Sequence, residues 1–129
     1  MKGALLAIAL TLAPSAAEAD CSTADLRGTW DAYVFGAEPE GTFIMRCVLR
    51  FNGLGRLRSD SSCDDESTLE GDVSVNSSCR FTAAVTQTFP DGEIVRCDYR
   101  ATLAKSKDDF AATGECDTSE ISLVNAIKQ

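Results

Sequence analysis

Hydrophobic and polar residues alternate along most of this chain with a period of two residues. Between Phe43 and Phe51, every second side chain is apolar or a cysteine, and the side chains between them include Arg46 and Arg50. The segments 79–89 and 93–103 follow the same pattern. A period of two residues is typical of strands that bury one face. The sequence therefore predicts β-strands whose cysteines lie on the buried face.

Turn residues separate the alternating segments. Asn52 to Gly55 and Pro90 to Gly92 carry hairpin chemistry, because glycine accepts a positive φ and proline presets φ. A short helical turn is expected within residues 22–27, and the last segment fits either a strand or a short helix. We expect eight strands, at residues 29–35, 42–51, 55–60, 67–75, 79–89, 93–104, 109–117 and 120–127. Short connections favour an all-β antiparallel meander that closes into a small up-and-down barrel, with a β-sandwich as the alternative.

Residues 1–19 have the features of a cleavable export signal. Lys2 precedes the apolar run Ala4–Ala13, and Ala17 and Ala19 supply the small residues that a signal peptidase selects. The run is about 15 Å long as a helix, which is too short to span a bilayer. We therefore expect a periplasmic or secreted protein whose residues 20–129 form a single domain, without a membrane span.

The chain contains six cysteines and no histidine. An even number of cysteines in a small exported chain indicates a disulfide framework, and their wide spacing does not fit a metal site. A lipid anchor on Cys21 is an alternative, but Glu18 and Asp20 depart from the pattern of lipoproteins. Strand register pairs Cys97 with Cys116 and Cys47 with Cys63, which leaves Cys21 for Cys79.

The charge balance is acidic. The chain has 12 basic and 20 acidic residues, a formal net charge of −8. This charge argues against nucleic acid and anionic membranes as partners and favours a basic protein. The carboxylates around Cys63 resemble an oxygen-rich calcium loop in composition, but their spacing differs from that of the EF-hand. We therefore expect a solvated loop, and no metal or cofactor.

Catalytic signals are weak. Histidine, the commonest general base, is absent, and no G-x-S-x-G motif occurs. We therefore expect a protein that is not an enzyme.

Gly28-Thr29-Trp30, which follows the expected helical turn, resembles the G-x-W start of lipocalins and related calycin barrels. In that family the tryptophan packs across the closed end of the barrel. The resemblance covers about ten residues and one motif, and the simpler interpretation of Trp30 is a core anchor. It implies a ligand site at the barrel mouth, for which we take Trp30, Phe43 and Tyr99 as candidate binding residues. Avidin-like barrels open similarly but use several tryptophans, and this chain has one.

Four arginines are expected to project from one face of the first long hairpin: Arg46, Arg50, Arg56 and Arg58. They are candidates for an anion or protein contact, unless nearby carboxylates neutralise them on a solvated surface.

Together these features predict an exported, non-catalytic, monomeric binding module for a small apolar ligand. The alternative is a protein-interaction or inhibitor domain that acts on a basic secreted hydrolase. The size of the barrel interior discriminates between the two, since a ligand binder needs an apolar cavity.

Overall fold

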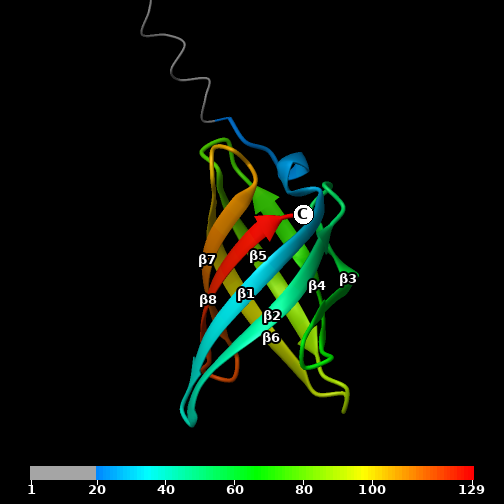
Figure 1. The fold of residues 1–129 in the computed structure, drawn as a ribbon, viewed down its shortest axis with the longest axis vertical. Coiled ribbons are helices and arrows are strands. Elements are labelled where there is room, and N and C mark those ends of the chain that lie inside the picture. The colour runs from blue at the N-terminus through cyan, green and yellow to red at the C-terminus, as the bar shows by residue number, and fades with distance from the viewer. Residues whose placement is uncertain (1–19) are drawn as a thin grey trace, which may run out of the picture.

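The computed structural model describes residues 20–129, which form a closed barrel of eight antiparallel strands (Figure 1). A 3-10 helix, η2 (Thr23–Leu26), precedes the barrel. The strands are β1 (Gly28–Glu38), β2 (Gly41–Phe51), β3 (Arg56–Cys63), β4 (Thr68–Val75), β5 (Arg80–Thr88), β6 (Ile94–Leu103), β7 (Asp109–Cys116) and β8 (Ile121–Lys128). The expected signal segment, residues 1–19, lies outside the described residues.

Each strand pairs with its neighbours in sequence, and β1 closes the barrel by pairing with β8 as well as with β2. The eight-stranded meander is thus confirmed, and the sandwich alternative is wrong. The last segment, for which a strand and a short helix were both expected, is the strand β8, and its side chains alternate between exposed and buried along its length. Closure gives every strand two partners, so no sheet edge remains unpaired.

One end of the barrel is closed by η2 and by aromatic side chains. Trp30 has no exposed surface, and its indole Nε1 donates a hydrogen bond to the Leu26 carbonyl at 2.7 Å. The Phe110 ring packs against it at 5.0 Å between centroids. Lys128 holds η2 from β8, because its Nζ donates to the Asp25 carbonyl and lies 5.4 Å from the centre of the Trp30 ring. We call this end, at the top of Figure 1, the closed end.

Three disulfides connect the cysteines in the pairs expected from strand register. They are Cys21–Cys79, Cys47–Cys63 and Cys97–Cys116. The first ties the segment before η2 to the loop between β4 and β5 at the closed end. The other two join neighbouring strands, β2 to β3 and β6 to β7, near the opposite end.

Candidate functional site

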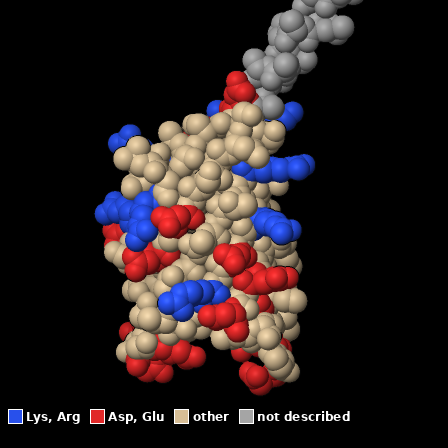
Figure 2. Space-filling model, turned by 180° about the vertical axis from the view of Figure 1, so that it is seen from behind, with Lys and Arg blue, Asp and Glu red and all other residues tan. Residues whose placement is uncertain are grey.

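The end of the barrel opposite η2, which we call the mouth, is ringed by carboxylates. Four connections meet there: β1–β2, β3–β4, β5–β6 and β7–β8. The loops themselves contain no lysine or arginine. Together with the last residue of β1, they supply nine acidic residues: Glu38, Glu40, Asp64, Asp65, Glu66, Asp91, Glu93, Asp117 and Glu120. Acidic side chains accordingly cover the lower end of the molecule in Figure 2.

An open hollow of about 510 Å³ lies at the mouth and combines apolar and acidic walls. Phe43, Met45 and Phe89 contribute apolar surface to it. Its carboxylates and remaining lining come from Glu38, Asp64, Asp65, Glu120, Ile44 and Gln87. Aromatic faces next to carboxylates are a favourable setting for a cation, because the ring quadrupole and the negative charge attract it together.

Two aromatic rings cross glycines at the mouth end of the interior. Phe43 pairs with Gly36, and a Cβ added at Gly36 would lie 2.2 Å from its ring. Tyr99 pairs with Gly114 in the same way, with 2.4 Å between its ring and an added Cβ. These glycines are therefore required because the rings lie directly over the neighbouring backbone.

The enclosed interior between the mouth and the closed end is small. Its cavity measures about 70 Å³ and has an almost entirely apolar lining, which includes Leu49, Phe81 and Tyr99. Pockets for drug-sized ligands are roughly 300–1,000 Å³. The barrel is thus largely filled by its own side chains.

Two loops on the rim share one design. In the first, Cys63 N donates to the Ser67 carbonyl and Glu66 N donates to the Cys63 carbonyl. In the second, Cys116 N donates to the Glu120 carbonyl and Ser119 N donates to the Cys116 carbonyl. The third residue after Cys63 and the third after Cys116 both have a positive φ, 69° for Glu66 and 68° for Ser119. The β3–β4 and β7–β8 loops therefore adopt the same local fold after a disulfide.

Each of these loops is also tied to the strand that carries its disulfide partner. Asp64 N donates to the Arg46 carbonyl, just before Cys47, and Asp117 N donates to the Arg96 carbonyl, just before Cys97, both at 2.9 Å. Because four strands separate the two loops in either direction around the barrel, they face each other across the mouth. Two disulfides thus hold two acidic loops at opposite sides of the rim.

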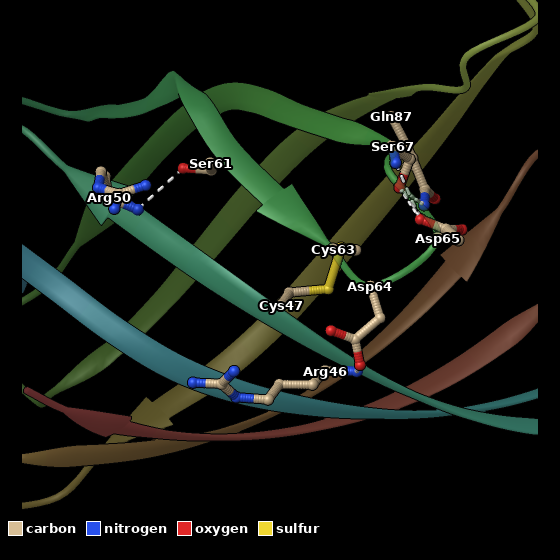
Figure 3. The surroundings of a disulfide bond; sticks show 9 residues. All are labelled: Arg46, Cys47, Arg50, Ser61, Cys63, Asp64, Asp65, Ser67 and Gln87. Atoms are coloured by element: carbon tan, nitrogen blue, oxygen red, sulfur yellow. Dashed lines mark hydrogen bonds between the residues drawn. A yellow bond between two sulfur atoms is a disulfide. The ribbon is translucent and has the colours of Figure 1, made fainter.

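Side-chain hydrogen bonds fix the first loop further (Figure 3). Ser67, which is fully buried, donates from Oγ and from its backbone N to Oδ1 of Asp65. Gln87 reaches across from β5 and donates to the Ser67 hydroxyl at 2.8 Å. The Asp65 carboxylate is therefore held in place before any partner arrives, which lowers the entropic cost of binding.

Neighbouring carboxylates act on Glu38 at the rim. The pKa of Glu38 is raised above its ordinary 4.5 by desolvation and by the neighbouring carboxylates Glu120 and Glu40. Further inside, burial raises the pKa of the Tyr99 hydroxyl, although a hydrogen bond with Ser122 opposes the change. A positive group at the rim would relieve the repulsion around Glu38.

The candidate ligand residues do not lie together. Trp30 is buried at the closed end, in contact with η2, whereas Phe43 and Tyr99 lie towards the mouth. Phe43 lines the open hollow, and Tyr99 lines the small enclosed cavity. Of these three residues, all within the described part of the chain, only Phe43 lies beside the acidic rim.

The four arginines of the hairpin each have an acceptor within the barrel. Arg46 forms an ion pair with Asp31, and Arg58 with Asp60. Arg56 contacts the carboxylates of Glu70 and Asp72, and Arg50 donates to the Asp60 carbonyl. These contacts lie on the outer wall and spread the guanidinium groups over several strands.

Two larger hollows, of about 720 and 780 Å³, lie on the outer wall over β4–β8. They are open grooves, lined in part by the small outward residues Thr82, Ala84 and Thr113. Acidic and basic side chains both border them, including Asp98 and Arg100. We regard the mouth as the stronger candidate, because there the charges share one sign and surround apolar side chains.

Two dipeptides repeat in the sequence at the places where the rim loops are held. Arg-Cys occurs at Arg46-Cys47 and again at Arg96-Cys97. Cys-Asp occurs at Cys63-Asp64 and Cys116-Asp117, where the rim loops begin, and also at Cys97-Asp98 within a strand. The acidic segment after Cys63, which is expected from the sequence to be a solvated loop, thus has a counterpart after Cys116. Within residues 20–129, no three histidine, cysteine, aspartate or glutamate side chains are placed to share a metal ion. No helix among these residues is long and apolar enough to cross a membrane.

Comparison with known proteins supports the fold. No protein-family model matches the chain, and no curated protein matches it either. Among solved structures, the chain is similar to a redesigned β-barrel, with a TM-score of 0.53 and 19% identity over 83% of this chain and 94% of that one. It is also similar to the redesigned β-barrel mFAP1 bound to DFHBI, with a TM-score of 0.55 and 16% identity over 83% of this chain and 97% of that one. The chain is thus a small closed β-barrel, and the narrower resemblance to lipocalins stays a prediction.

Proposed function

We propose that this protein is an exported, non-catalytic binding module whose acidic mouth holds a positively charged segment of a partner protein. The observation that carries the proposal is the rim of nine carboxylates, whose four loops contain no lysine or arginine, beside an open hollow with apolar walls. The partner class is a basic protein, such as a basic secreted hydrolase. The disulfides and the net charge of −8 support an oxidising compartment and attraction to a cationic partner.

The hollow and the rim would contact different parts of a cationic side chain. Phe43 and Phe89 offer apolar surface for the stem of a lysine or arginine, and the surrounding carboxylates attract its charged head. Because the two disulfide-held loops face each other, a partner that places cations on both sides of the mouth engages both at once.

Titration calorimetry with an eight-residue oligolysine tests the proposal, with an oligoglutamate of equal length as the opposite-charge probe. We expect oligolysine to bind with an affinity that falls steeply between low and physiological salt, and oligoglutamate to give no heat. The double variant Glu66→Gln/Asp117→Asn removes one charge from each rim loop and should weaken binding about tenfold. The matched variant Asp98→Asn/Asp109→Asn removes two carboxylates from exposed strand positions outside the rim loops. It should change the affinity less than about twofold, and equal losses in both variants would contradict a site at the mouth.

A basic hydrolase gives the functional readout. We expect the wild-type protein to slow the turnover of lysozyme, a basic hydrolase, on its polymeric substrate, and the rim double variant to do so less. Binding of oligolysine without any effect on lysozyme would leave a cation-binding module and exclude inhibition of this hydrolase.

A small apolar ligand is the second candidate. It is supported by the apolar lining of the enclosed cavity and by the likeness to mFAP1, whose structure is bound to DFHBI. A cavity of about 70 Å³ has to enlarge before it admits such a ligand. Saturable enhancement of the fluorescence of 1-anilinonaphthalene-8-sulfonate by the native protein, lost when Tyr99→Trp fills the cavity, would favour this candidate.

A further inference from the structure

One side of the barrel wall carries an unusual concentration of exposed apolar side chains. Of the eight large hydrophobic residues that are exposed in residues 20–129, six lie on the outer face of the adjacent strands β8, β1 and β2. We call this surface the apolar face; its residues are Tyr33, Phe35, Ile44, Ile121, Leu123 and Ile127. Phe35 is at the centre, because it pairs with Ile44 on β2 and with Leu123 on β8.

The opposite wall is polar. Outward positions on β4, β5 and β6 are occupied by threonine, serine, alanine and charged residues, apart from Ile94 at the start of β6. Figure 2 shows acidic and basic side chains scattered over the molecule seen from behind. The contrast excludes a general excess of surface hydrophobicity. Apolar area is concentrated where three strands meet, as in a protein–protein contact surface.

The size of the apolar face matches an interface. Its six side chains are between 44% and 73% exposed, which amounts to roughly 700 Å² if a large side chain has about 200 Å². The largest apolar patch on a typical monomer is roughly 300–600 Å², and a standard interface buries about 800 Å² per partner. The face is thus large enough to form most of one side of a stable contact.

The charges beside the apolar face favour a second copy of this chain as the occupant. One ion pair, Asp31 with Arg46, lies beside the apolar face, and its two charges cancel on a molecule of net charge −8. Across a two-fold axis, Arg46 of each copy can reach Asp31 of the other. A self-complementary surface of this kind is what an isologous dimer requires.

The ends of the barrel decide the orientation. The loops at the mouth carry acidic residues and no lysine or arginine, whereas the closed end carries both carboxylates and cations, among them Arg27, Arg80, Lys105, Lys107 and Lys128. A parallel arrangement would place two acidic mouths side by side. An antiparallel arrangement places each mouth beside the closed end of the other copy, where cations are present.

We propose that the protein forms an antiparallel homodimer through the apolar face of β8, β1 and β2, which departs from the monomer expected from sequence. The interface includes Ile44, which also lines the hollow at the mouth, but the argument for the dimer does not depend on the proposed function of the mouth.

Sedimentation equilibrium of the native, oxidised protein purified from the full chain tests the association. We expect a dimer that Phe35→Glu dissociates, with the dissociation constant raised at least about 30-fold. Ile44→Glu, at the most exposed position of the face, should act in the same direction with little effect on folding, which Trp30 fluorescence reports. Thr82→Glu, an exposed outward position on β5, adds the same charge away from the face and should leave the dimer intact. A monomer at all concentrations, or a dimer that survives both substitutions in the apolar face, overturns the proposal.

Zero-length carbodiimide cross-linking tests the orientation. Lys107 lies at the closed end, within 3.5 Å of Asp25, and Glu40 lies in the β1–β2 turn at the mouth. Strands of eight to eleven residues separate these ends by roughly 25 Å or more, so one copy cannot link them. We expect a Lys107–Glu40 cross-link in the dimer and its loss in Phe35→Glu. A dimer without this cross-link between the ends overturns the antiparallel arrangement.

Discussion

The Cys21–Cys79 disulfide is expected to contribute more stability than either of the other two. It closes a separation of 58 residues, whereas Cys47–Cys63 closes 16 and Cys97–Cys116 closes 19. A cross-link stabilises mainly by lowering the entropy of the unfolded chain, and this effect grows with the logarithm of the closed length. The relation gives about 4 kcal/mol for the first disulfide and about 3 kcal/mol for each of the others.

Two double variants isolate this difference. Cys21→Ala/Cys79→Ala and Cys97→Ala/Cys116→Ala each remove two buried sulfurs, so their losses of packing are similar. We expect the first to lose about 1 kcal/mol more of the unfolding free energy than the second. A domain of this size has a total of roughly 5–15 kcal/mol, so both losses are large enough to measure.

Urea denaturation followed by Trp30 fluorescence provides the assay, because Trp30 is the only tryptophan and lies in the closed end. The denaturant slope should stay similar in the two variants, so the midpoints report stability. An equal or smaller loss for Cys21→Ala/Cys79→Ala would refute the reasoning from loop length.

Three further predictions follow from the closed end, the mouth and the rim. Trp30→Ala should lower the unfolding free energy by about 3–5 kcal/mol, because it empties a fully buried site and removes the hydrogen bond to the Leu26 carbonyl. Thermal unfolding measures this loss, and a loss below about 1 kcal/mol would contradict the packing at the closed end. Gly114→Ala should destabilise the barrel more than Gly92→Ala, because a Cβ at Gly114 meets the Tyr99 ring whereas Gly92 has open space but a positive φ; equal midpoints in urea would refute it. Glu38 has a raised pKa in the folded protein, so the folded state binds more protons than the unfolded state just above pH 4.5, and stability should rise as pH falls through that window. Glu38→Gln should flatten this rise in thermal melts, and an unchanged pH profile would count against repulsion at the rim.

Much of the architecture follows from local sequence. The period-two pattern places Cys47, Cys97 and their neighbours on inward faces, because successive side chains of a strand point to opposite sides. Because the turns are short, successive strands pair antiparallel, and this pairing puts Cys47 opposite Cys63 and Cys97 opposite Cys116. These properties depend on the spacing of residues near one another in the chain, so the sequence alone determined them.

The candidate site depends on closure of the barrel, which no local pattern contains. Pairing of β1 with β8 brings the four acidic connections into one ring and sets the β3–β4 loop opposite the β7–β8 loop. The same closure joins Phe35 to Leu123 and Ile44 in the apolar face. Whether an eight-stranded barrel is hollow depends on how rings such as Phe43 and Tyr99 pack across it, and that packing is a property of the whole interior. The strands and the two disulfides between neighbouring strands thus follow from local spacing, whereas the positions of charge, apolar surface and interior space follow from closure of the barrel.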